Sequence, residues 1–286
     1  MNILIKVAGF LGDTLWASTA ALPLILKYHS EPVQVYMQLR FFQCYEVMRL
    51  NPHITNVWVG EPPKDMTFDK VFTFGQVNFG EPATIQFQRQ CGIENPILEY
   101  KVYTNKYYDE VARQMLSPHK RELPVIAYQA NWEEKSFLFT EEEYIRGIDI
   151  PPLGYGGKRR NINYVLQELS EHYTLLEVGF PSGTPQSEAG GVFTTPIYSM
   201  TASLLKYCDY MVGPEGGATY LAAGVGCKTI ISGDFAHQLY GWNGVIQKHK
   251  TPHYGPDTYF PNDGHITVNP YATDKELVNE IVRIIG

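Results

Sequence analysis

Long hydrophobic segments are missing from this sequence. Among its 286 residues no run of about 18 apolar residues occurs, and Gly9, Gly12 and Asp13 interrupt the apolar N-terminal segment. A membrane-spanning helix needs such a run, and a secretory signal peptide needs an uninterrupted apolar region. We therefore expect a cytoplasmic protein that does not insert stably into a membrane.

Cysteine pairs and metal motifs are also lacking. The four cysteines lie far apart and form no CxxC pair, so the sequence indicates neither a disulfide framework nor a zinc cluster. Histidine and aspartate residues gather between positions 249 and 265, but their spacing matches no metal site and is typical of a polar surface loop. No G-x-S-x-G nucleophile motif occurs. We expect reduced thiols, no metal and no bound cofactor.

Positive charge is in deficit. The formal net charge is −7 at pH 7, so the long-range field of the protein repels phosphate backbones and anionic lipids. Any bound anion must therefore be held by local groups. Lys158, Arg159 and Arg160 form a dense basic cluster, which is either part of a solvated loop or a local patch for an anion.

What the sequence does contain is an alternation of short apolar runs and amphipathic segments. In the first half it predicts strands at 2–8, 32–37, 56–60 and 70–74, and helices at 13–30, 41–51 and 81–93. The second half predicts strands at 124–129, 174–179, 210–213 and 228–232, and helices at 161–173, 201–209, 219–226 and 274–285. Such alternation is typical of parallel βαβ units.

The repeated pattern predicts an α/β protein of two Rossmann-like domains that face each other across a cleft. We place the seam near residues 117–124, which gives domains of residues 1–121 and 122–286. The last helix packs either within its own domain or back on the first. Ligands of open α/β sheets bind at the carboxyl ends of the strands, so the residues directly after each strand are the candidates for a site.

A glycine-rich turn follows the strand at 210–213. It leads into a helix, whose N-terminal amides and partial positive charge favour an anion. One interpretation is a diphosphate site formed by Glu215, Gly216, Gly217 and Ala218. The other is that the glycines only allow tight turning and close packing of the helix, because the strict G-x-G-x-x-G fingerprint is absent.

Asp13 stands where the first strand gives way to a helix, on the side of the expected cleft. It is either a catalytic carboxylate or an N-cap that accepts hydrogen bonds from nearby amides. Thr14, directly after it, is an alternative source of the cap. Gly12 and Thr14 flank Asp13 and are weaker candidates for the same site.

Lys135 follows the first strand of the second half. A lysine in that loop can neutralise a phosphate in the cleft as a point charge, although most single lysines have no such role. The next helix is expected to begin with a capping box of Thr140 and Glu143.

Together these stretches resemble glycosyltransferase family nine, the heptosyltransferase-like group, over nearly the whole chain. The resemblance rests on Gly12-Asp13 with STAAL behind it, on Lys135 before FLFTEEEY, and on DYMVGPEGGATYL at 209–221. It implies the two-domain GT-B fold. It also implies that the first domain binds the acceptor and the second binds a nucleotide sugar.

The resemblance assigns a role to each matched position. Asp13 corresponds to the general base that removes the proton of the acceptor hydroxyl. The turn from Glu215 to Gly217 corresponds to the diphosphate site of the donor, and Lys135 to a group that neutralises phosphate charge. The implied reaction is an inverting, metal-independent transfer of a sugar from a nucleotide-diphosphate sugar.

Several positions depart from the family pattern. Glu215 replaces an aspartate, Gly216 a serine or threonine, and Tyr220 a histidine. No carboxylate stands at 180–181, where the family has an acidic residue for the ribose, and Glu177 is earlier, within the predicted strand. These departures leave the nucleotide and the sugar open.

The residues after the strand at 228–232 supply weaker candidates. Asp234 and His237, together with Tyr220, are placed near the sugar or nucleotide of the donor, although either of the first two could be an ordinary turn residue. The acceptor is a glycan, a small molecule or a modified nucleic-acid base, and the oligomeric state is open. The alternative functions are a nucleotide-sugar hydrolase or epimerase of GT-B shape and a non-catalytic nucleotide- or glycan-binding protein.

Overall fold

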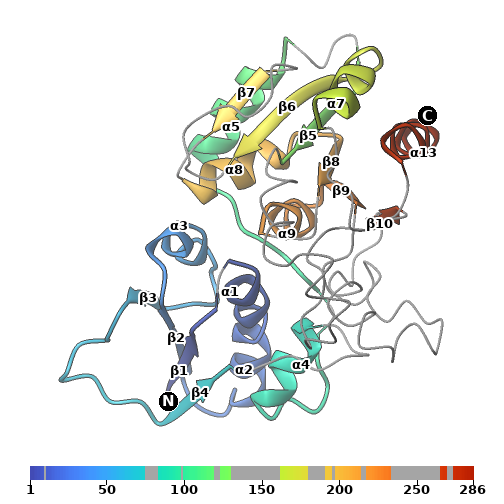
Figure 1. Cartoon of the computed structure of the whole chain (residues 1–286). Coiled ribbons are helices and arrows are strands. Elements are labelled where there is room, and N and C mark those ends of the chain that lie inside the picture. Colours follow the sequence, from blue (N-terminus) through green and yellow to red (C-terminus); the bar gives the residue numbers. More distant parts are fainter. Residues whose placement is uncertain are drawn as a thin grey trace, which may run out of the picture.

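The fold is known from a computed structural model. It describes residues 1–9, 11–74, 83–97, 99–118, 123–129, 162–179, 191–194, 197–213, 217–232, 265–268 and 273–286. Within these residues the chain forms two separate parallel sheets, each with its own helices (Figure 1). This confirms the predicted α/β class with two Rossmann-like domains.

The first sheet has four strands in the order β3-β2-β1-β4. They are β1 (Asn2–Val7), β2 (Gln34–Leu39), β3 (Asn56–Val59) and β4 (Lys70–Thr73). The accompanying helices are α1 (Leu11–Ser18), α2 (Ala21–Lys27), the 3-10 turn η1 (Phe42–Cys44), α3 (Tyr45–Met48) and α4 (Ala83–Gln90). We call this unit the first domain.

The second sheet has six strands in the order β10-β9-β8-β5-β6-β7. They are β5 (Val125–Tyr128), β6 (Thr174–Gly179), β7 (Gly191–Thr194), β8 (Tyr210–Gly213), β9 (Lys228–Ser232) and β10 (His265–Val268). Its helices are α5 (Lys106–Leu116), α7 (Ile162–Ser170), α8 (Tyr198–Leu205), α9 (Gly217–Gly224) and α13 (Asp274–Ile285). We call this unit the second domain.

The central strand β5 shows how the sequence builds the core of the second domain. All four of its residues are buried. Because side chains alternate along a strand, Val125 and Ala127 face one apolar cluster while Ile126 and Tyr128 face the other. A strand buried on both faces must be apolar throughout, which is why it was recognisable in the sequence.

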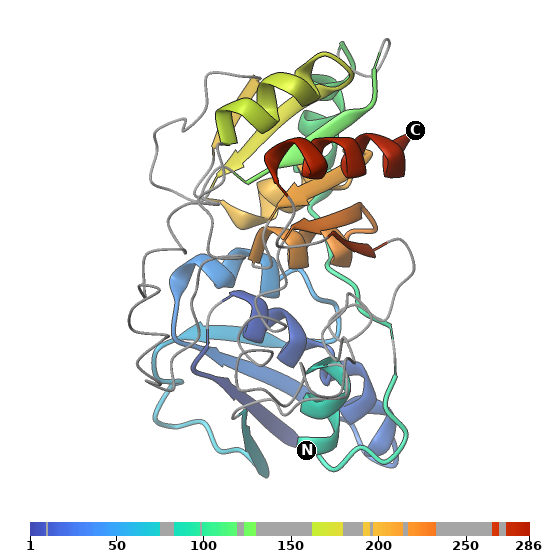
Figure 2. The ribbon, with the colours of Figure 1, turned by 45° about the vertical axis from the view of Figure 1, so that its right-hand side comes forward.

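The last helix, α13, packs within the second domain. Thr273 caps it, with Glu276 completing a capping box. Its buried face, Leu277, Val278 and Ile281, joins the cluster beneath α7, and Figure 2 shows the two helices side by side. The alternative expectation, that this helix returns to the first domain, is not what the structure has, because its apolar stripe is covered by the second domain.

Helix α5 also lies with the second domain, although it precedes the predicted seam. It packs against α8, and Lys206 at the end of α8 forms an ion pair of 2.7 Å with Asp109. The chain therefore crosses between the domains before Lys106 (Figure 1). The domain limits proposed from the sequence remain a prediction.

Two details of the secondary structure differ from expectation. The helix expected at 13–30 is two helices, because the hydroxyls of Ser18 and Thr19 donate to the carbonyls of Leu15 and Trp16 at the break. Pro23 falls in the first turn of α2, where its missing N–H costs no helix bond. The short strands β7 and β10 were not predicted from the sequence.

Candidate active site between the domains

Asp13 lies in the first turn of α1, directly after β1 and therefore at the carboxyl edge of the first sheet. The helix begins at Leu11, so Asp13 is inside the helix and not its N-cap. Its carboxylate packs over Gly9, where any side chain would overlap with it. A negative charge is favourable in the first turn because the helix start carries partial positive charge.

A thiol and a hydroxyl group accompany Asp13. Thr14 is 1% exposed, and its hydroxyl hydrogen-bonds the thiol of Cys44 in η1. Burial raises the pKa of Cys44 to about 11; the Thr14 hydrogen bond lowers it and the charge of Asp13 raises it further. The thiol is therefore protonated at neutral pH. Thr14 contributes to packing here and does not cap the helix.

A phenol from the second domain reaches the same place. Tyr198 is the first residue of α8, and α8 contacts α3 of the first domain. Burial raises the pKa of Tyr198 to about 12, with a further contribution from the nearby Cys44. Asp13, Thr14, Cys44 and Tyr198 thus form a group drawn from both domains. Sequence reasoning missed Cys44 and Tyr198 because no motif marks them.

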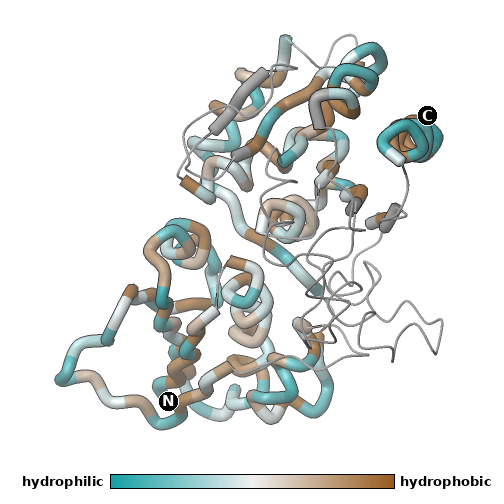
Figure 3. Tube along the Cα trace, in the orientation of Figure 1, coloured by the Kyte–Doolittle hydropathy of each residue, from teal (hydrophilic) through white to brown (hydrophobic). Residues whose placement is uncertain are grey.

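The start of α9 faces the start of α1. Gly217 is the first residue of α9, and a Cβ placed on it would lie 3.0 Å from Cδ2 of Leu11. Ala218 follows and is 1% exposed. Figure 3 shows that α9 has no strongly hydrophilic face, which fits its position between the domains. For Gly217 the structure supports the packing interpretation, and its predicted contact with a diphosphate remains a prediction.

Tyr220 is an interdomain contact. Its side chain is 4% exposed, and a Cβ on Gly12 would lie 2.7 Å from its Cε2. The ring meets Trp16 edge-on, with centroids 4.8 Å apart. Its carbonyl accepts a hydrogen bond of 2.9 Å from the hydroxyl of Tyr100. Gly12 is therefore needed where the ring of Tyr220 packs, and this ring is buried against the first domain. The predicted contact of Tyr220 with the donor remains a prediction.

The remaining predicted site residues lie outside the part of the chain that the structure describes. Their roles stay predictions; they are Lys135, Glu215, Gly216, Asp234 and His237.

Two polar residues mark the carboxyl edge of the second sheet. Gln129, directly after β5, is 6% exposed, and its Oε1 has no hydrogen-bond partner among the described residues. Glu177 lies within β6, as the sequence suggested, and accepts a hydrogen bond of 3.3 Å from the hydroxyl of Tyr128. Glu177 is 1% exposed, so its carboxylate is buried beside β5 and is not displayed at the surface. Gln129 was not singled out earlier, although its place after a strand could have identified it.

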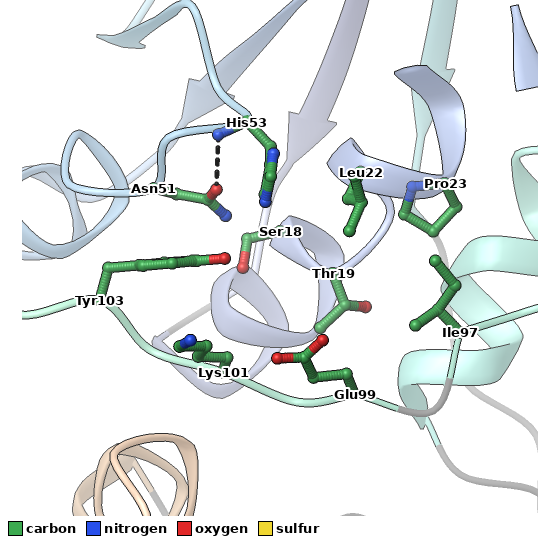
Figure 4. A pocket seen from close by; sticks show the side chains of 10 residues that line it. All are labelled: Ser18, Thr19, Leu22, Pro23, Asn51, His53, Ile97, Glu99, Lys101 and Tyr103. Atoms are coloured by element: carbon green, nitrogen blue, oxygen red, sulfur yellow. Dashed lines mark hydrogen bonds between the residues drawn. The ribbon is translucent and has the colours of Figure 1, made fainter. Parts of the chain in front are cut away.

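A separate hollow of about 30 Å³ lies at the other end of α1 (Figure 4). It is lined by the α1–α2 turn, the turn before β3 and the segment that leads to the second domain. The side chain of Asn51 accepts a hydrogen bond of 3.0 Å from the amide of His53 there. Asp13 does not line this hollow, so the hollow is distinct from the group between the domains.

The described ranges contain neither a metal-binding cluster nor a membrane-spanning helix. Within these ranges no group of three or more histidine, cysteine, aspartate or glutamate side chains is placed to hold a metal ion. No helix of the described residues combines the length and the apolar character needed to cross a membrane.

Known structures share this architecture at very low sequence identity. E. coli ADP-heptose LPS heptosyltransferase II is 10% identical, with a TM-score of 0.65, over 100% of this chain and 98% of that one. A family 9 glycosyltransferase from Veillonella parvula is 10% identical, with a TM-score of 0.63, over 99% and 97%. The E. coli heptosyltransferase WaaC with ADP-2-deoxy-2-fluoro heptose is 11% identical, with a TM-score of 0.58, over 100% and 99%.

Sequence comparison alone gives no relative. No protein-family model matches the chain, and no curated protein matches it. The likeness therefore concerns the arrangement of the elements. The chain has the two-domain GT-B fold of these glycosyltransferases.

Proposed function

We propose that the protein is a glycosyltransferase that moves a sugar from a nucleotide-diphosphate sugar to an acceptor hydroxyl, with inversion and without a metal ion. The observation that carries the proposal is the position of Asp13. Its half-buried carboxylate stands at the carboxyl edge of the first sheet, in the helix turn that meets the start of α9. The likeness to WaaC, which was solved with ADP and with an ADP-sugar, supports a nucleotide-sugar donor.

In the proposed reaction Asp13 accepts the proton of the acceptor hydroxyl as its oxygen attacks the anomeric carbon of the donor. The bond from that carbon to the diphosphate oxygen breaks, and the diphosphate leaves with the electron pair. Amides at the start of α9 and the ammonium of Lys135 stabilise the charge that develops on the leaving group. A single well-placed donor in such a site contributes about 3–4 kcal/mol.

The first experiment identifies the donor. A panel of nucleotide sugars is screened by thermal shift, because ligand at about 100 times its dissociation constant stabilises the folded state by about 2.7 kcal/mol. Transfer is then followed with and without EDTA, and we expect no effect of the chelator. Sugar release in the absence of an acceptor would instead identify a hydrolase. If no nucleotide sugar binds, the proposal is wrong.

The second experiment tests the base. Asp13→Asn should lower the transfer rate by about 10²–10⁴-fold while the donor still binds, since only proton removal is lost. The matched control is Asp65→Asn, an exposed aspartate in a turn of the first domain. Unchanged transfer by Asp13→Asn would remove Asp13 from the mechanism. A cytoplasmic location is part of the same proposal and is tested by cell fractionation.

A further inference from the structure

The hollow at the end of α1 lies against the segment that joins the two domains, residues 97–103. Alternate side chains of this segment face opposite ways. Tyr100 and Val102 are buried, and the amide of Val102 donates a hydrogen bond of 2.7 Å to the carbonyl of Gly224 in α9. The side chains that line the hollow are instead those of Glu99, Lys101 and Tyr103 (Figure 4). The hollow is thus bordered by the first domain and by a segment that is tied to the second.

Hydrogen-bond donors face the hollow from two sides. Asn51 is 7% exposed, and its Oδ1 accepts from the amide of His53, which leaves its Nδ2 to face the hollow (Figure 4). Among the described residues nothing accepts a hydrogen bond from this Nδ2. The ammonium of Lys101 lies 5.4 Å from the centroid of the Tyr103 ring and forms no ion pair within the described part of the chain. An amide N–H and an ammonium together suit a carboxylate.

Hydrogen-bond acceptors face the same hollow. The hydroxyls of Ser18 and Thr19 donate their hydrogens to backbone carbonyls of the preceding turn, at 2.7 and 2.6 Å, so only their oxygen lone pairs remain. Helix α1 ends at Ser18 without a basic residue in its last turn, so the partial negative charge of the helix end is not compensated there. Glu99 adds a full negative charge and forms no ion pair with any described residue. These groups suit an ammonium.

The two opposite charges meet at Tyr103. Burial raises the pKa of Tyr103, and the nearby charge of Glu99 raises it further, while Lys101 lies over the ring of the same residue. The ring of His53 meets it edge-on, with the centroids 6.1 Å apart. A phosphate in the hollow would be repelled by Glu99, and a simple amine would be repelled by Lys101. A ligand that carries both signs of charge is attracted by both residues.

The hollow is preorganised on both sides of Glu99. The side-chain amide of Gln88 in α4 donates to the carbonyl of Ile97 and accepts from its amide, both at 2.7 Å. Tyr100 donates its hydroxyl to the carbonyl of Tyr220 at 2.9 Å. A ligand therefore does not have to order this backbone when it binds. The enclosed volume of about 30 Å³ holds about two or three positions of the size of a water molecule, so only a compact charged group fits.

We propose that the hollow binds the ammonium and carboxylate groups of a small α-amino acid such as alanine. Lys101 and the Nδ2 of Asn51 hold the carboxylate. Glu99 and the two hydroxyl oxygens at the end of α1 hold the ammonium. Leu22 and Pro23, which also line the hollow, contact the short apolar side chain. The site lies apart from the group between the domains and does not depend on the proposed transfer reaction.

The test is an NMR chemical-shift titration, which gives both the affinity and the residues that the ligand contacts. The probes are L-alanine, acetate, methylamine and inorganic phosphate. Alanine should bind and should shift the amide signals of His53 and Lys101. It should bind at least about 10-fold more tightly than acetate or methylamine, because each of these satisfies only one of the two charges.

Two variants assign the charges. Lys101→Met and Glu99→Gln each remove one charge from an exposed side chain, and each should weaken alanine binding about 2- to 12-fold, as expected for one lost hydrogen bond. Lys101→Met should also weaken the binding of acetate, whereas Glu99→Gln should not. The matched controls are Lys106→Met and Glu94→Gln, at exposed positions that do not line the hollow.

The inference is overturned if alanine does not bind, or if acetate, methylamine or phosphate binds as tightly as alanine. It is also overturned if Lys101→Met and Glu99→Gln bind alanine as well as the parent protein does, or if the two control variants weaken binding equally. Alanine binding by Asp13→Asn separates this site from the proposed function. That variant should lose transfer and bind alanine like the parent protein.

Discussion

The contact between Gly12 and Tyr220 makes a quantitative prediction about how the two domains are held together. A methyl group on Gly12 would lie 2.7 Å from Cε2 and 2.8 Å from Cδ2 of Tyr220. Carbon atoms in good contact are about 3.5–4.0 Å apart, so the ring or the helix must move by about 1 Å. Overpacking of this kind costs about 1–3 kcal/mol. Against this, alanine is favoured over glycine in a helix by about 1 kcal/mol.

The balance predicts that Gly12→Ala destabilises the protein by about 0–2 kcal/mol, and that its effect changes sign when Tyr220 is truncated. In the Tyr220→Ala background the methyl group has room, so the same substitution should be neutral or stabilising by up to about 1 kcal/mol. The interaction energy between the two sites is then about 1–3 kcal/mol. It is measured from the free energies of urea unfolding of the four proteins in a double-mutant cycle.

Additive effects in that cycle would refute the reasoning. They would mean that the ring of Tyr220 does not lie on Gly12 in solution, and hence that α1 and α9 do not meet as described. Tyr220→Ala alone is expected to cost about 3–5 kcal/mol, the usual cost of truncating a buried aromatic side chain. A much smaller loss would also contradict its burial between the domains.

Three further predictions concern other parts of the fold. Thr273→Ala should lower the free energy of unfolding by about 1 kcal/mol, because it removes the cap of α13, whereas Thr273→Ser should retain most of it. Burial alone would raise the pKa of Asp109, but hydrogen bonds from Lys206, Ser203 and Thr104 lower it below 3.8. The charged carboxylate of Asp109 therefore adds stability above about pH 3.8, and this stability is lost as the pH falls through the lowered pKa. The difference between the urea midpoints at pH 7 and at pH 3 should accordingly be smaller in Lys206→Met than in the parent protein. All four cysteines are buried, so a thiol reagent at pH 8 should label none rapidly in the native protein and all four in denaturant.

Much of the fold was predictable because several of its strands, among them β1 and β5, are largely buried on both faces. Such strands read as continuous apolar runs, as in NILIKV for β1 and VIAY for β5, and parallel pairing follows from the helices between them. The strands β7 and β10, with the sequences GVFT and HITV, have only four residues each and lie at the two edges of the sheet. Short edge strands give too little periodic signal to be recognised.

The candidate site was predictable only where it depends on local sequence. Asp13 was identified because a carboxylate directly after a first strand has a known place in this type of fold, and the structure puts it at that edge. The packing of Tyr220 on Gly12 and the approach of Tyr198 to Cys44 join residues more than a hundred positions apart. Such contacts depend on how the two domains pack, which no local pattern encodes.

Two helix starts meet at the junction of the domains, and their charges must be balanced. Leu11 of α1 packs against Gly217 of α9, and each helix start carries about half a positive charge. Asp13 supplies a negative charge in the first turn of α1, whereas the first turn of α9 contains no acidic residue. The start of α9 is therefore favourable for an anion, and two are available in the proposal: the carboxylate of Glu215, just before the helix in sequence, and the diphosphate of the donor. Because the two repel each other, both cannot hold the same amides. Glu215 keeps the negative charge of the aspartate that it replaces, so the same competition for the amides is expected with either residue.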